Sequence, residues 1–161
     1  MARVETALLL VVAALVLLLV VVRPHAAPPP SPYCRGGPAL AGVYHSDRLE
    51  VKKRCAVAAG VVTTVKFEEF DGDVHVDLRT DKGEKLVVEV IPQDRSVVPI
   101  PETGATVTVV GPSVYDTAHG WPEIHPAWWI SNGRIVPAST RELARVQSLL
   151  GDTHGEQEVT G

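Results

Sequence analysis

Apolar residues are arranged along this chain in three ways, and each arrangement predicts a different kind of element. An unbroken apolar run, Ala7–Val22, follows a short amino-terminal segment that contains Arg3. Apolar residues at helical spacing near the other end predict a short amphipathic helix. Between them, runs rich in β-branched residues predict five strands, Cys55–Phe70, Val74–Arg79, Lys85–Ile91, Thr106–Tyr115 and Glu123–Ile130.

The first 23 residues predict a signal anchor, a single helix that crosses the membrane. The apolar run would span about 24 Å as a helix, which tilting and flanking residues can extend toward a hydrocarbon core of about 30 Å. Arg23 and Pro28 stand where a cleavage site needs small uncharged residues, so we expect an uncleaved anchor. A cleaved export signal is the alternative. Residues 24–32 are rich in proline and predict an extended linker.

The strand pattern predicts one small β domain, residues 33–137. The segment from Val74 to Arg79 alternates strictly between apolar and polar residues, which is typical of a half-buried strand. Gly60 lies in the middle of a long first strand and would let that strand bend and pair with both ends of the sheet. Five strands of this kind predict a closed barrel.

The carboxyl-terminal segment predicts a helix, residues 138–151, and then a disordered polar tail, residues 152–161. Ser139 and Glu142 have the spacing of a capping box, which begins the helix. Gly151 follows the last apolar positions and predicts the end of the helix.

Cys34 and Cys55 are the two cysteines of the chain, and they flank the start of the domain. In an oxidising compartment they would form one disulfide, which closes a loop of about 20 residues and stabilises a small domain. Two separate buried thiols are the alternative, and the absence of a C-x-x-C pair argues against a zinc site built from them. A disulfide favours a domain outside the cytoplasm. We therefore expect a single-pass protein of the cell membrane whose domain is extracytoplasmic.

Three segments carry a resemblance to a family. They are Val43-Tyr44-His45 with Arg48-Leu49, Asp71-Gly72-Asp73-Val74-His75, and His119-Gly120-Trp121-Pro122-Glu123-Ile124-His125-Pro126. In this order they resemble small exported or membrane-anchored bacterial and archaeal proteins that have an OB-fold-like domain and no assigned function. The resemblance implies a five-stranded OB-like Greek-key barrel from Cys55 to Ile130.

Histidines and acidic residues gather in or beside these segments. Imidazole and carboxylate together bind zinc and similar divalent ions, so the candidate metal ligands are His75, Asp116, His119 and His125. The candidate residues for binding another ligand are His75, Asp77, Trp121, Glu123, His125 and Trp129. Structural roles compete with each of these, because such side chains also shape turns, cap loops and pair across sheets.

Charge and missing motifs narrow the function. The chain carries a net charge of −4, which argues against a general nucleic-acid binder. It has no nucleophile elbow, phosphate-binding loop or H-E-x-x-H motif, so we predict no catalytic residue and no resident cofactor. The sequence predicts a non-catalytic binding or interaction module with an unidentified protein or small-molecule partner. The alternatives are a single-stranded nucleic-acid binder, a metal-binding protein or metal-dependent enzyme, and a purely structural domain.

Overall fold

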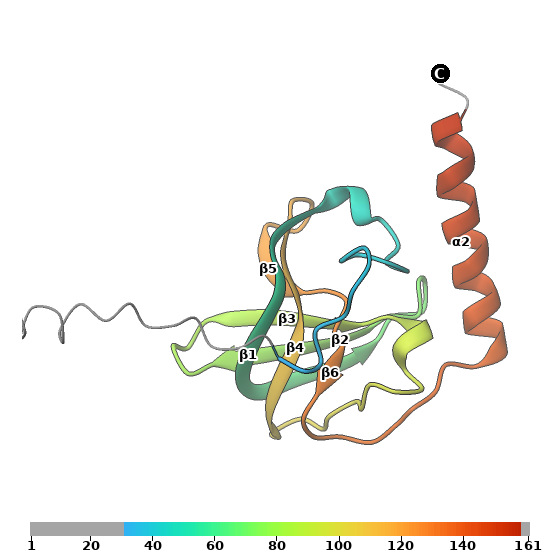
Figure 1. The fold of residues 1–161 in the computed structure, drawn as a ribbon. Coiled ribbons are helices and arrows are strands. Elements are labelled where there is room, and N and C mark those ends of the chain that lie inside the picture. Colours follow the sequence, from blue (N-terminus) through green and yellow to red (C-terminus); the bar gives the residue numbers. More distant parts are fainter. Residues whose placement is uncertain (1–30, 159–161) are drawn as a thin grey trace, which may run out of the picture.

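Strands dominate the computed structural model, which describes residues 31–158 (Figure 1). The strands are β1 (Leu49–Phe67), β2 (Val74–Thr80), β3 (Lys85–Val90), β4 (Thr106–Asp116), β5 (Trp121–Ile124) and β6 (Trp129–Ile130). Two 3-10 turns, η1 (Ser46–Arg48) and η2 (Pro92–Asp94), and the helix α2 (Thr140–Glu158) complete the described elements. The predicted anchor, residues 1–23, and most of the predicted linker, residues 24–32, lie outside the residues that the structure describes. Within residues 31–158, no helix combines the length and apolar character needed to cross a membrane.

Five of the strands form a closed sheet. β1 pairs with β2 and also with β4, and the order from β2 onward is β3, β5 and β4. All of these pairs are antiparallel except β3 with β5, which is parallel. Gly60 pairs with Thr80 of β2 and with Val107 of β4, so the long first strand changes partners at this glycine. The predicted role of Gly60 is confirmed.

The interior of the closed sheet is filled by β-branched and other aliphatic side chains. The alternation predicted for β2 is confirmed, because Val74, Val76 and Leu78 are at most 1% exposed while the residues between them face outward. The core residues are Val62, Val74, Val76, Leu78, Val88, Val90, Val98, Ile100, Val107, Val109, Ile124, Ala127 and Ile130.

The first and last predicted strands differ most from the structure, while the other three end within one residue of the prediction. β1 begins at Leu49 rather than Cys55, because Leu49 already pairs with Asp116 of β4. The charged residues that follow Leu49 point to solvent and obscure the strand pattern. The predicted strand Glu123–Ile130 is instead two strands, β5 and β6, and the break includes Pro126, which has no amide hydrogen to donate to a sheet.

The helix α2 begins as predicted but is longer. Ser139 N donates to Glu142 at 2.6 Å and Glu142 N donates to the Ser139 hydroxyl at 3.2 Å, which confirms the capping box. The helix continues through Gly151 to Glu158, so the predicted end at residue 151 and most of the predicted tail are replaced by helix. Gly151 does not adopt the left-handed conformation that ends a helix. In Figure 1, α2 stands beside the closed sheet.

Replacing Gly60 with alanine should destabilise the closed sheet by about 1–3 kcal/mol, as overpacking typically does. A Cβ at this position would lie 2.6 Å from the Arg79 carbonyl oxygen, which belongs to the backbone of β2 and cannot swing away. Urea unfolding of the full chain measures the effect. Gly36→Ala is the matched control, because its Cβ would meet nothing within 4 Å; equal stability of both variants would contradict the prediction.

Replacing Glu142 with alanine should weaken α2 by about 1 kcal/mol at pH 7, the usual scale for a helix cap. Hydrogen bonds from Ser139 and Arg95 lower the pKa of Glu142 to about 2. The stability from its charge is therefore present above pH 4.5 and is lost as the pH falls toward 2. Unfolding followed by circular dichroism should show the difference from wild type narrowing between pH 7 and pH 3. The exposed Glu84→Ala is the control; a pH-independent difference would contradict the ionic part of the explanation.

Candidate functional site

The site lies at one end of the closed sheet. β3 and β5 run parallel, so their carboxyl ends lie at the same end, and antiparallel β2 begins there. Glu89 is the second-last residue of β3, Asp73 directly precedes β2, and His125 directly follows β5. His75 pairs with Glu89 in register, on the outer face of the sheet.

Residues 31–48, which we name the strap, cross the outside of this sheet (Figure 1). Leu40 and Val43 of the strap pack with Leu49, Ile91 and Val114 in a small second core. The predicted disulfide between Cys34 and Cys55 is present and joins the strap to β1. Further contacts hold the strap: Tyr33 stacks on Trp129 at 4.2 Å between ring centres, and Arg35 pairs with Asp94 at 2.7 Å.

Three buried polar residues meet at this end of the sheet, and we name them the buried triad: Asp73, Glu89 and His125. Each is at most 4% exposed. His125 Nδ1 lies 3.0 Å from Glu89 Oε2, and His125 Nε2 lies 3.4 Å from Asp73 Oδ2. No hydrogen bond satisfies Nε2. One donor atom from each residue lies within 4.8 Å of the donor atoms of the other two.

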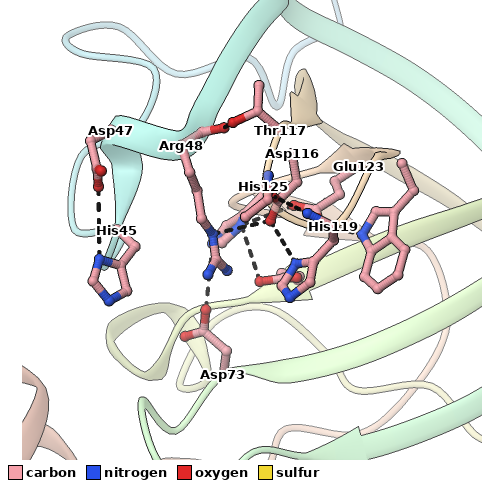
Figure 2. Close-up of polar contacts among 12 residues, drawn as sticks. His45, Asp47, Arg48, Asp73, Asp116, Thr117, His119, Glu123 and His125 are labelled. Atoms are coloured by element: carbon pink, nitrogen blue, oxygen red, sulfur yellow. Dashed lines mark hydrogen bonds and ion pairs between the residues drawn. The ribbon is translucent and has the colours of Figure 1, made fainter.

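A second polar group adjoins the buried triad, as Figure 2 shows. Asp116 Oδ2 lies 2.8 Å from His119 Nδ1 and 3.1 Å from Arg48 Nε. Asp116 Oδ1 also accepts from the backbone N–H of His119 at 3.0 Å. Glu123 lies between the two groups: its Oε2 is 3.4 Å from His125 Nδ1, and one of its carboxylate oxygens lies within 4.8 Å of donor atoms of Asp116 and His119. The strap therefore contributes Arg48 to a continuous polar network.

The local environment shifts several pKa values in this network. Burial raises the pKa of Asp73 to about 6, although His125 opposes the shift. Burial alone would lower the pKa of His125, but Glu89, Asp73 and Glu123 outweigh it and raise that pKa to about 10. Burial likewise opposes ionisation of Glu89, but its two histidine neighbours, His125 and His75, lower its pKa overall. At neutral pH the network therefore holds carboxylates around an imidazolium.

The network carries an excess of negative charge. Its buried carboxylates are Asp73, Glu89, Asp116 and Glu123. Arg48 and protonated His125 oppose them, which leaves two negative charges, or one when His75 is also protonated. Uncompensated buried charge is costly, so Arg48 and the imidazolium of His125 are important for holding these carboxylates together.

A pocket of about 310 Å³, which we name the histidine pocket, opens beside the network on the outer face of β1, β2 and β3. Its lining residues are Thr64, Lys66, Glu68, His75, Asp77, Lys85, Val87, His119 and Trp121.

Each heteroaromatic ring of the histidine pocket is held by a carboxylate behind it. His75 Nε2 lies 3.1 Å from Glu89, and Trp121 Nε1 donates to Glu123 at 2.6 Å. His119 contacts Asp116 in the same way and stacks on Trp121 at 4.7 Å between ring centres. These bonds fix the orientation of the rings before any ligand arrives.

The structure brings most of the candidate residues together. His75, Asp77, His119 and Trp121 line the histidine pocket, and Asp116, Glu123 and His125 lie in the network behind it. Comparison with models of known protein families and with curated proteins finds no match for this chain. The site's own geometry therefore carries the functional inference.

Trp129 and His45 do not join the site. Trp129 stacks on Tyr33 of the strap, and exposed His45 faces Asp47 at 3.8 Å, away from the network (Figure 2). Trp128, by contrast, is buried at 7% exposure. Residues 125–128 separate Trp129 from the end of β5, although β5 and β6 both pair antiparallel with β4.

Sequence reasoning missed three residues of the network: Asp73, Glu89 and Arg48. In the sequence, Asp73 follows Gly72 and is typical of a turn residue. Glu89 had a usable signal, because it is the one charged residue inside the otherwise apolar segment from Leu86 to Ile91, where a charge has to be buried with partners. The residues around Arg48 do not indicate that it belongs to the network, since its partner Asp116 is distant in sequence.

Proposed function

We propose that this chain is a non-catalytic binding domain of OB-like architecture, held outside the cytoplasm by its amino-terminal anchor, and that the histidine pocket is its ligand site. The closed order β1-β2-β3-β5-β4, with β4 returning to β1, supports an OB-like Greek-key barrel. The Cys34–Cys55 disulfide supports an oxidising compartment. The observation that carries the proposal is the convergence of four candidate residues, from separate sequence segments, on one pocket.

The position of the pocket supports ligand binding. OB-like domains bind oligonucleotides or oligosaccharides on the face of strands two and three, and the histidine pocket lies on that face. A larger hollow of about 560 Å³ lies along the middle of β1 and the β2–β3 turn, but none of the buried polar network lines it. The histidine pocket combines an aromatic pair with fixed polar groups, which is the composition of a recognition site.

The charges of the pocket favour an uncharged polar ligand, which we take to be an oligosaccharide. The two pocket lysines are already paired, Lys66 with Glu68 at 2.7 Å and Lys85 with Asp77 at 3.2 Å. The buried carboxylates behind the rings add negative charge. Both features disfavour a polyanion such as a single-stranded nucleic acid. The paired acidic and basic side chains can exchange hydrogen bonds with the hydroxyl groups of a sugar. The rings of His119 and Trp121 beside them can pack against its apolar face.

Calorimetric titration of the full-length protein in detergent tests this proposal. The probes are cellotetraose, chitotetraose and a dodecamer of thymidylate. We expect binding of at least one saccharide, its recovery unchanged by mass spectrometry, and no binding of the oligonucleotide. Trp121→Ala should weaken saccharide binding by about tenfold or more, as loss of an aromatic anchor does. Phe70→Ala removes an exposed aromatic outside the pocket and is the matched control.

Three results would overturn the proposal. They are the absence of binding by both saccharides, binding of the oligonucleotide instead, and unchanged saccharide binding by a folded Trp121→Ala protein. Cleavage of a bound saccharide would overturn the non-catalytic part.

A further inference from the structure

Two side chains of the histidine pocket already contact the indole ring of Trp121. His119 stacks on this ring at 4.7 Å between ring centres, with the two ring planes 11° apart. The ammonium nitrogen of Lys85 lies over the same ring, 5.0 Å from its centre. The proposed ligand has to pack against the ring of Trp121, so one of these two side chains has to give way.

Strand order explains why the two side chains reach the ring from different directions. β5 lies between β3 and β4, and Trp121 is its first residue. Val87 of β3 pairs in parallel register with Glu123 of β5. Two residues earlier on each strand, Lys85 and Trp121 lie side by side on the same face. Lys85 therefore approaches the ring from the β3 side, whereas His119 approaches it from the turn that joins β4 to β5.

His119 is held firmly in its place by Asp116. Its Nδ1 lies 2.8 Å from Asp116 Oδ2, and its backbone N–H donates to Asp116 Oδ1 at 3.0 Å. Asp116 is fully buried and pairs with Arg48. Moving the imidazole would break a contact with a buried carboxylate, which is costly. We therefore expect His119 to stay on Trp121 when a ligand binds.

Lys85 is held much more weakly than His119. Its side chain is 56% exposed, and its ammonium pairs with Asp77 at 3.2 Å in addition to contacting the ring. Exposed ion pairs and exposed cation–π contacts each contribute little, and the four-carbon stem of lysine is flexible. Lys85 is therefore the side chain that a ligand can move at small cost.

We propose that Lys85 covers the ring of Trp121 before the ligand binds and that a saccharide displaces it, so that Lys85 determines the affinity and specificity of the site. The proposal rests on the proposed function, because the saccharide is the displacing group. The apolar face of a sugar takes the place of the ammonium on the ring, and a sugar hydroxyl donates to the Asp77 carboxylate that Lys85 leaves. A ligand that offers only one of these groups does not replace both contacts of Lys85.

Nuclear magnetic resonance of the full-length protein in detergent follows Lys85 directly. Protons over the face of an indole ring are shifted upfield by the ring current. We expect the Cε protons of Lys85 to be shifted upfield in the protein alone and Trp121→Ala to abolish this shift. Saturation with cellotetraose or chitotetraose, whichever binds, should move these signals to the position of an exposed lysine.

Calorimetric titration of Lys85 variants measures the cost of displacement. Lys85→Ala should bind the same saccharide about threefold to tenfold more tightly, which is the combined scale of an exposed ion pair and a cation–π contact. Lys85→Arg keeps both contacts and stacks well on an aromatic ring, so it should bind no more tightly than the native chain. Lys82→Ala is the matched control, because it removes an exposed lysine outside the histidine pocket and should leave the affinity unchanged.

The outcomes separate this proposal from the proposed function. The cover is disproved if folded Lys85→Ala binds no more tightly than the native chain, if Lys82→Ala tightens binding equally, or if the Lys85 signals carry no ring-current shift. Saccharide binding that leaves those signals unmoved would overturn the displacement alone and leave the ligand site standing. Failure of both saccharides to bind would overturn the proposed function, and the displacement with it. Far-ultraviolet circular dichroism confirms that each variant is folded.

Discussion

His125→Leu is expected to lower the free energy of unfolding by about 3–5 kcal/mol, the usual cost of removing one member of a buried ion pair. The imidazole is 2% exposed and lies within 3.4 Å of Asp73, Glu89 and Glu123. Its pKa is raised to about 10, so it is a cation at neutral pH and stabilises those carboxylates. Leucine fills much of the space but leaves the acids buried without a counter-charge. Urea unfolding of the variant and the native protein measures the loss.

A double variant separates charge from packing in this prediction. Glu89→Leu removes the carboxylate nearest His125 Nδ1, so the pair His125→Leu with Glu89→Leu should cost less than the sum of the two single changes. His45→Ala is the control for loss of an imidazole, because exposed His45 has no place in the network, and it should change stability by less than about 0.5 kcal/mol. Strict additivity of the two leucine changes would show that the buried charges are not coupled.

The features of the fold that sequence predicts well are those set by local periodicity. The alternation from Val74 to Arg79 determines which face of β2 enters the core, whatever the strand pairs with. Gly60 marks the bend of β1 because no other residue fits so close to a neighbouring backbone. The start of β1 at Leu49 could not be read in this way, because its pairing with Asp116 is a long-range contact and its following residues are charged.

The site was predictable in its residue types but not in its connections. The D-G-D-x-H and H-G-W-x-E-I-H-P segments supplied His75, His119, Glu123 and His125, since polar residues so clustered are conspicuous in sequence. The partner of each depends on strand register and on the parallel pairing of β3 with β5. Glu89 could be assigned to the site only once the register of β2 with β3 was known.

Removal of the disulfide is the other change with a large expected effect. Cys34→Ser with Cys55→Ser should lower the free energy of unfolding by roughly 3 kcal/mol, since the bond joins residues 21 positions apart and restricts the unfolded chain. Denaturant unfolding of the full chain measures the change. Reduction of the native protein should produce the same loss, while reductant should have no effect on the double variant.

Loss of this bond should act first on the strap. The strap is otherwise held by a few contacts, which include the Tyr33–Trp129 stack and the Arg35–Asp94 pair, whereas the closed sheet has its own continuous core. Limited proteolysis should therefore cut the reduced protein within residues 31–48 before it cuts the strands, and the β-sheet circular dichroism should persist. Because the strap carries Arg48 to Asp116, its release should also expose that buried carboxylate to water. Simultaneous cleavage of strap and strands, or an unchanged unfolding midpoint on reduction, would show that the disulfide does not hold the strap over the site.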